Sequence, residues 1–390
     1  MITKIINAKL VMPTGILEGW NLHFADGVIT DITNQSLPAD RIIDAGGNYL
    51  CPGLIDIHVH GGDGFEFIDA TEEAVLSAAN IHAKHGTTTI FPTLSAYSET
   101  DACAAMDAIR SCLGKPELLP NIGGVHLEGP YFSANQAGAQ DPRFIRDPDP
   151  DEYCRLVEQY GDLIRRWSYA PEKPGSVEFQ KYLAKHGIVA AAGHTDAEYD
   201  HLKAVFGLGC RLITHLYSGT STITRHGGFR HLGTIETAYL LDEMDVETIA
   251  DGCHLPPLLL QLIFKLKGRE HMCLVTDAIR YGGRTDCENV RTGTDAVPYI
   301  IEDSVAKLAD RSAFAGSIAT MDALVRVCVQ KAGISLADAV YMATAVPARI
   351  MGLERKGQLK VGFDADMVVL DPKLQVQQVF VAGSRRSSSF

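Results

Sequence analysis

The sequence predicts an α/β fold whose main part is a closed (β/α)8 barrel, accompanied by a small β domain. Three observations predict this fold. Short, β-rich apolar runs alternate with helical segments through the middle of the chain. Both ends of the chain carry strand patterns without intervening helices. No glycine-rich nucleotide-binding motif follows any of the expected strands, so the main competitor, a doubly wound open sheet, has no motif to support it.

The two chain ends are expected to pair with each other. Strands are predicted within residues 2–10, 21–32, 362–370 and 376–382, and the second range turns at an Asp-Gly pair. Unpaired sheet edges are costly to leave open. We therefore expect one small β domain from residues 1–53 plus 355–390, around a catalytic barrel of residues 54–354. The alternative is that each end decorates the barrel separately. The Ser- and Arg-rich stretch 383–390 is expected to be disordered.

The barrel strands are predicted from the apolar runs, at residues 54–59, 87–92, 122–127, 165–170, 188–192, 211–214, 246–250 and 272–276. Helices are expected between them. Thr71 is predicted to cap a helix that ends at Gly86, and Thr100 one that ends at Gly114. Two more helices are predicted at 321–332 and 335–345, and Pro347 suits the first turn of another.

Composition excludes several classes of function. The chain has 390 residues, 35 basic and 48 acidic, and a net charge of −13, which disfavours binding to nucleic acid or to an anionic membrane. No apolar run approaches the roughly 20 residues of a membrane helix, and no signal peptide is visible. The nine Cys contain no C-x-x-C pair, which argues against a disulfide framework. We expect a cytoplasmic enzyme.

Histidines and carboxylates fall where the expected strands end. In a barrel all these ends lie at one mouth, where such folds carry their active sites. His58 and His60 are two residues apart at the end of the first strand, so they share one face of it. The others follow later strands, in the order Glu128, His194, His215, His254 and Asp277. Imidazole with carboxylate suits Zn²⁺ or Fe²⁺ better than Ca²⁺ or Mg²⁺.

These motifs resemble the amidohydrolase superfamily, and more closely its N-acetylglucosamine-6-phosphate deacetylase family. The resemblance covers nearly the whole chain. Its motifs are P-G-L-I-D-I-H-V-H at 52–60, H-L-E-G-P at 126–130, G-H-T at 193–195, T-H-L-Y at 214–217, D-G-C-H at 251–254, T-D-A at 276–278, F-A-G-S at 314–317 and G-F-D-A-D at 362–366. The implied fold is a TIM barrel of the metal-dependent hydrolase type with a small β-sandwich domain.

The resemblance also implies a mechanism. Glu128, His194 and His215 would hold one divalent ion, and His58 and His60 a second ion bridged by Glu128, giving one or two ions of Zn or Fe per subunit. Asp277 would act as general base and then general acid in removing an N-acetyl group from an amino-sugar phosphate. Many amidohydrolases use a carboxylated Lys after the fourth strand. Here that strand ends Tyr-Ala-Pro-Glu, which favours Glu128 as the shared carboxylate.

Substrate contacts are implied in several loops. Arg225, His226 and Arg230 follow the sixth strand, where the family carries a phosphate-binding Arg. That Arg comes from the neighbouring subunit, which implies a homodimer. Further contacts are expected at Gln140, Ser218, Gly219, His254, Phe314 and Gly316. Gln140 stands where relatives have a His, and Ser218-Gly219 stands where they have Asn-Ala.

These departures leave alternatives open. The substrate could be N-acetylgalactosamine 6-phosphate, which differs at one hydroxyl. The chain could instead be an amidohydrolase that acts on another amide. A non-catalytic binding protein on an inherited barrel is disfavoured, because such proteins tend to lose metal ligands and the full set is present here.

Overall fold

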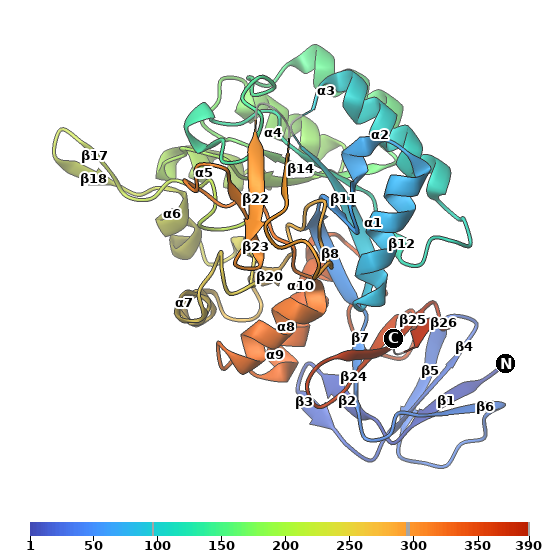
Figure 1. Ribbon diagram of the computed structural model, residues 1–390. Helices are drawn as coiled ribbons and strands as arrows, with labels where there is room; N and C mark the ends of the chain where they lie inside the picture. The colour runs from blue at the N-terminus through green and yellow to red at the C-terminus, as the bar shows by residue number, and fades with distance from the viewer. Residues whose placement is uncertain (96, 294–296, 389–390) are drawn as a thin grey trace.

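The computed structural model describes residues 1–95, 97–293 and 297–388 and contains the predicted barrel (Figure 1). Its parallel strands are β8 (Leu54–Val59), β11 (Thr87–Ser95), β13 (Val125–Glu128), β14 (Ile164–Tyr169), β15 (Val189–Ala192), β16 (Leu212–Ile213), β19 (Asp245–Thr248) and β20 (Met272–Leu274). The seam between β20 and β8 is joined by a parallel bridge between Val59 and Ala278. The prediction of a (β/α)8 barrel is confirmed.

The third predicted strand is shorter than expected. Residues 122–127 divide into β12 (Asn121–Ile122) and β13, both of which pair with β11. The break falls at Gly123 and Gly124, where the backbone runs too close to Phe91 and Arg165 to admit a side chain. Such glycines mark a close approach that interrupts a strand.

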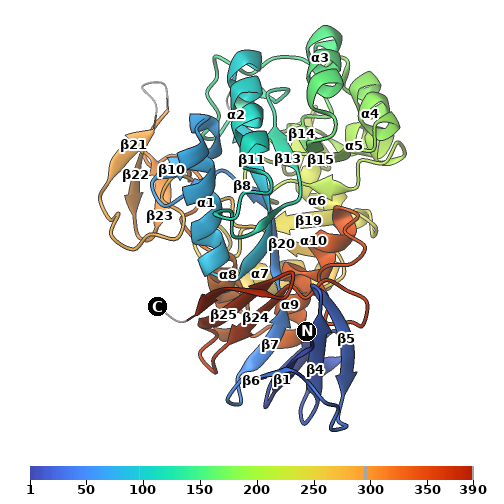
Figure 2. The same ribbon diagram turned by 90° about the vertical axis from the view of Figure 1, so that its right-hand side faces the viewer.

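Helices cover the outside of the barrel (Figure 2). They are α1 (Glu72–Lys84), α2 (Glu99–Cys112), α3 (Pro150–Tyr160), α4 (Ser176–Lys185), α5 (Tyr199–Phe206), α6 (Thr234–Leu240), α7 (Pro257–Lys267), α8 (Met321–Gln330), α9 (Leu336–Ala343) and α10 (Ala345–Ile350). Thr71 caps α1 as predicted. The prediction for α2 was wrong by two residues: Ser98, not Thr100, is the cap, because Asp101 at the third helical position completes a capping box with it.

Both chain ends contribute to one sheet beneath the barrel (Figure 1). Its strands, in order, are β26 (Ser384–Ser388), β25 (Val376–Val381), β24 (Met367–Leu370), β7 (Tyr49–Pro52), β2 (Lys9–Met12) and β3 (Gly15–Leu17). A second sheet holds β5 (Val28–Thr33), β4 (Asn21–Ala25), β1 (Thr3–Ile6) and β6 (Arg41–Asp44). The proposed domain boundaries at residues 53/54 and 354/355 stay a prediction.

The shared sheet lies between two apolar cores because its side chains alternate in direction. Val368 and Val379 pack into the core of the barrel. Their neighbours Met367 and Phe380 pack into the core formed with the N-terminal strands. This period of two is the ordinary consequence of the strand pleat. The sheet therefore fixes the small β layer against the barrel.

The expected disorder of 383–390 was wrong for residues 384–388, which form β26, while 389–390 lie outside the described residues. Ala382 and Gly383 both have positive φ angles between β25 and β26. A two-residue turn of this kind directs the chain straight back along the preceding strand. The turn geometry explains why a Ser- and Arg-rich segment forms a strand here.

Two insertions on the barrel contain strands that were not predicted. The hairpin of β17 (Thr224–His226) and β18 (Phe229–His231) follows β16 and extends away from the barrel (Figure 1). The three-stranded sheet of β21 (Arg291–Gly293), β22 (Pro298–Glu302) and β23 (Val305–Leu308) lies between β20 and α8 in the sequence. In the described part of the chain, no helix combines the length and apolar character that crossing a membrane requires.

Candidate metal centre and active site

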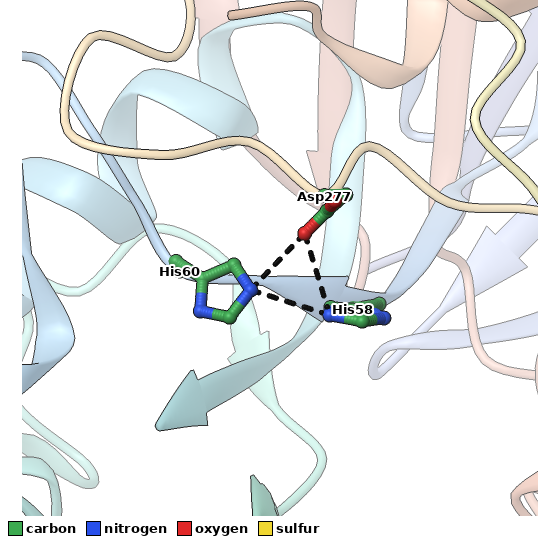
Figure 3. Close-up of side chains that lie close together, drawn as sticks. All are labelled: His58, His60 and Asp277. Atoms are coloured by element: carbon green, nitrogen blue, oxygen red, sulfur yellow. Dashed lines mark hydrogen bonds and ion pairs between the residues drawn. The ribbon is translucent and has the colours of Figure 1, made fainter. Parts of the chain in front are cut away.

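One cluster of the predicted polar side chains lies where β8 and β20 end (Figure 3). His60 Nε2 is 3.0 Å from Asp277 Oδ1 and 3.2 Å from His58 Nε2. His58 Nε2 is 3.4 Å from the same Asp277 oxygen. The three ligand atoms thus converge on one point, as the shared face of His58 and His60 on their strand predicts.

A second cluster adjoins the first through Glu128. Its Oε1 atom lies 2.9 Å from His215 Nε2, 3.3 Å from His194 Nε2 and 3.4 Å from His58 Nε2. Its Oε2 atom lies 3.4 Å from His60 Nε2. One carboxylate therefore contacts both groups of imidazoles, which is the position that a ligand shared between two ions has to occupy.

The backbone is strained where these strands end. His194, His215 and Asp277 have φ angles of 44°, 27° and 49°, in the left-handed region that residues other than glycine seldom adopt. Such a conformation costs about 1–3 kcal/mol per residue and is concentrated at functional sites. Here it turns all three side chains inward at the mouth of the barrel.

Each imidazole is oriented by a second contact at Nδ1. The Nδ1 atom of His194 lies 2.7 Å from the carbonyl of Gln136, and that of His215 lies 3.0 Å from the carbonyl of Ser218. His58 Nδ1 lies 3.1 Å from Glu247, and His60 Nδ1 lies 3.3 Å from the Ser95 hydroxyl. A carbonyl or carboxylate at Nδ1 holds the proton there. The Nε2 lone pair is then free to bind a metal.

Sequence reasoning missed the ion pair beneath the site. Arg166 in β14 and Glu247 in β19 are both fully buried and form an ion pair inside the barrel. Glu247 Oε2 accepts hydrogen bonds from the His215 backbone N–H and from His58 Nδ1, each at 3.1 Å. Burial alone would raise the pKa of Glu247, but the charges of Arg166 and His58 outweigh burial and lower the pKa to about 2. The only available signals were the Arg pair in β14 and the two acidic residues in β19, and nothing in the sequence shows which of these charges point into the barrel.

A cavity of about 600 Å³ opens above the clusters. His60, Glu128, His194, His215 and Asp277 line it. The predicted substrate residues Gln140, Ser218, Gly219, His254, Phe314 and Gly316 line it too. Lining residues that were not predicted include Glu66, Arg143, Arg280 and Tyr299, the last from the inserted sheet. The cavity thus collects residues from loops that are far apart in the sequence.

Two of the predicted substrate residues have informative partners. The Gln140 side-chain amide donates a hydrogen bond of 2.8 Å to Glu128 Oε2, so its nitrogen points into the metal centre. His254 Nδ1 lies 2.7 Å from Asp251, and its ring packs against Phe314 with 4.6 Å between centroids. The Asp251 contact fixes the orientation of the His254 ring on the cavity wall.

The three predicted phosphate-binding residues lie elsewhere. Arg225, His226 and Arg230 are exposed on the β17–β18 hairpin, and none of them is among the described residues that line the cavity of this chain. Arg225 and Arg230 are directly opposite each other across the hairpin, on the two strands. His226 instead contacts Glu198, with 2.6 Å between Nε2 and Oε1.

The donor set fits a divalent transition metal. Four ligands at about 2.0–2.1 Å around a tetrahedral ion lie about 3.3 Å from one another. The contacts between imidazole nitrogen and carboxylate oxygen at the two clusters, from 2.9 to 3.4 Å, match that spacing. Burial would raise the pKa of Glu128, but His58, His194 and His215 hold it well below its usual range. Glu128 is therefore a carboxylate and available as a ligand.

We predict that Arg166→Met lowers the free energy of unfolding by about 3–5 kcal/mol, because it leaves the buried Glu247 carboxylate without its counter-charge. Urea denaturation followed by circular dichroism measures the change. The double variant Arg166→Met/Glu247→Gln should regain part of this loss, since it removes the uncompensated charge. Equal stability of the wild type and Arg166→Met would contradict the assignment.

Comparison with known proteins gives a consistent set of relatives. The amidohydrolase family model matches residues 49–386. The N-acetylglucosamine-6-phosphate deacetylase of Lysinibacillus sphaericus is 30% identical over 384 residues, which cover 98% of this chain and 97% of that protein. The N-acetylgalactosamine-6-phosphate deacetylase of Escherichia coli O157:H7 is 29% identical over 387 residues, 99% of this chain and 100% of that one.

A solved structure is also similar over the full chain. It is a variant of the N-acetyl-D-glucosamine-6-phosphate deacetylase of Mycobacterium smegmatis in complex with N-acetyl-D-glucosamine-6-phosphate. The TM-score is 0.88 at 30% sequence identity, and the alignment covers 99% of this chain and 98% of that one. The similarity includes both the barrel and the small β layer.

Proposed function

Because the chain belongs to the amidohydrolase family, we propose that it hydrolyses the N-acetyl group of N-acetylglucosamine 6-phosphate, giving glucosamine 6-phosphate and acetate. The observation that carries the proposal is the convergence of Glu128, His194 and His215 beside Asp277 in one cavity at the barrel mouth. Relatives about 30% identical over nearly the full chain, which carry this activity in their names, support it. The chain is thus a hydrolase that acts on a linear amide.

The two clusters support an assignment of metal ligands. We assign Glu128, His194 and His215 to one ion, and His58 and His60 to a second ion that shares Glu128. Imidazole and carboxylate favour Zn²⁺ or Fe²⁺. When bound, such an ion supplies Lewis acidity and lowers the pKa of water towards about 7.

Asp277 is the residue we assign to proton transfer. Burial would raise its pKa, but His58 and His60 outweigh burial and lower the pKa to about 2, so the group is a carboxylate at neutral pH. It lines the cavity and can take a proton from the water that attacks the acetyl carbon. It then gives that proton to the amide nitrogen as the C–N bond breaks, which releases the amine and acetate.

Gln140 and the cavity wall orient the substrate in this proposal. The Gln140 amide points towards the metal centre and is a neutral donor for the acetyl oxygen. His254, Phe314, Gly316, Ser218 and Gly219 line the space left for the sugar ring. A sugar with the opposite configuration at one hydroxyl fits the same description. The relative from Escherichia coli O157:H7 therefore makes N-acetylgalactosamine 6-phosphate the second candidate substrate.

We assign the phosphate to Arg225 or Arg230 of a neighbouring subunit in a homodimer. Arg225 and Arg230 are directly opposite each other in the register of the hairpin, and like charges in that position are destabilising unless an anion offsets them. The hairpin extends away from the barrel of its own chain (Figure 1). Ile223 and Phe229 are 46% and 78% exposed there, and Leu258 on α7 is 78% exposed, which favours a covering partner. A cytoplasmic location stays a prediction.

The substrate assignment is tested by measuring acetate release from N-acetylglucosamine, N-acetylgalactosamine and their 6-phosphates in the presence of Zn²⁺ or Fe²⁺. We expect the phosphorylated glucosamine derivative to have the highest kcat/KM. A higher kcat/KM for N-acetylgalactosamine 6-phosphate would make that sugar the preferred substrate. Activity on neither 6-phosphate would reject both.

Asp277→Asn tests the proton-transfer role. We expect kcat to fall by about 10²–10⁴-fold, the usual contribution of general acid–base catalysis. The ion held by Glu128, His194 and His215 should remain, as metal analysis of the purified variant can establish. Turnover near the wild-type rate with bound metal would remove Asp277 from the mechanism.

Hybrid dimers test the origin of the phosphate ligand. We expect Arg225→Ala to lower kcat/KM for the phosphorylated sugar by about 10- to 100-fold, because one charged hydrogen bond is lost. When Arg225→Ala chains are mixed and reassembled with equal amounts of Asp277→Asn chains, about half of the dimers are hybrids. One of the two sites in each hybrid has both Arg225 and Asp277, so the mixture should regain about a quarter of the wild-type rate at low substrate concentration. Each variant dissociated and reassembled alone, at the same total concentration, gives the baseline rate. No recovery would mean that the Arg serves its own chain.

A further inference from the structure

The β17–β18 hairpin has two chemically different faces. Residues directly opposite each other in an antiparallel pair share a face, and here Thr224 is opposite His231 while Arg225 is opposite Arg230. His226 is two residues from Thr224 on the same strand and therefore shares its face. The hairpin thus presents its histidines on one face and its arginines on the other.

The histidine face contacts a carboxylate from the body of the barrel. Glu198 is the residue that precedes α5, and its side chain is only 24% exposed. Its Oε1 atom is 2.6 Å from His226 Nε2, and its Oε2 atom is 3.4 Å from His231 Nδ1. The two imidazole rings lie 4.5 Å apart at 78° to each other. Three ligand atoms from three separate segments therefore lie within 4.8 Å of one another.

We propose that Glu198, His226 and His231 form a second metal site, for a divalent transition-metal ion such as Zn²⁺, outside the catalytic cavity. Two imidazoles and one carboxylate are a common ligand set for Zn²⁺ in proteins and leave a fourth position for water. None of the three residues is among the described residues that line the cavity. The ion would therefore be distinct from those held at the barrel mouth.

A structural role for this ion follows from the hairpin itself. Each strand has three residues, joined by Gly227 and Gly228, and an isolated two-stranded hairpin is marginally stable in water. The Thr224 hydroxyl also donates a hydrogen bond of 2.6 Å to Glu198. A metal ion bound by Glu198, His226 and His231 would link both strands of the hairpin to the start of α5. Because Arg225 and Arg230 lie on the opposite face, this link would also fix the direction in which they project; this consequence alone rests on the proposed function.

Metal counting on the intact holoenzyme tests the site directly. The wild type, His231→Gln, Glu198→Gln and the control His186→Gln are equilibrated with the same micromolar free Zn²⁺, and bound zinc is measured by atomic emission. His186 is an exposed histidine at the end of α4 that does not belong to the proposed site, so its variant controls for general loss of an imidazole. We expect the wild type and His186→Gln to bind one more ion per chain than His231→Gln and Glu198→Gln. Equal counts in all four proteins would overturn the proposal.

Hydrogen exchange of the hairpin amides gives a second readout that needs no substrate. Added Zn²⁺ should slow exchange in residues 224–231 of the wild type and of His186→Gln, because the metal-bound hairpin opens less often. His231→Gln should show no such change. Zinc-dependent protection in His231→Gln equal to that of the wild type would contradict the site. Both measurements are independent of deacetylation, so failure of the proposed function would leave them interpretable.

Discussion

The contact between the Glu128 carboxylate and four imidazole rings is the interaction on which the rest of the site depends. Its two oxygens lie 2.9–3.4 Å from nitrogens of His58, His60, His194 and His215, almost without exposure to water. Bringing so many polar groups together in a barrel is unfavourable unless each has a partner. The second contacts at every Nδ1 and the strained backbone at His194 and His215 are the local devices that satisfy this requirement.

The buried Arg166–Glu247 ion pair beneath the metal centre also provides partners for polar groups of the site. The Glu247 carboxylate accepts hydrogen bonds from the backbone of His215 and from the ring of His58. Arg166 on β14 forms an ion pair with this carboxylate inside the barrel and neutralises its charge. A buried pair of this kind contributes little net stability compared with an apolar core. We attribute the presence of this ion pair in the interior to its effect on His58. Glu247 orients the His58 ring and holds the proton on Nδ1, which an apolar residue could not do.

The sequence predicted the barrel, its eight strands and the cluster at the mouth because these follow from periodicity and from where strands end. His58 and His60 could be placed on one face from their spacing alone. The Arg166–Glu247 pair could not be predicted, because no local pattern links a charge in β14 to one in β19. Likewise Thr100 and Ser98 are both good caps, and only the reach of Asp101 decides between them. The β17–β18 hairpin also escaped prediction, because its strands of three residues are too short to show alternation.

The net charge of −13 gives that hairpin its significance. An anionic substrate approaching an acidic molecule needs a local concentration of positive charge, and Arg225 and Arg230 provide one on a single face. Like charges on residues that are directly opposite in a hairpin are destabilising, so the strands that carry Arg225 and Arg230 need stabilising contacts from elsewhere. The opposite face supplies that stabilisation through Glu198 and its histidine partners. In the proposed arrangement, a cation bound by Glu198, His226 and His231 would hold the hairpin in place, and an anion bound by the arginines would offset the positive charge on the other face.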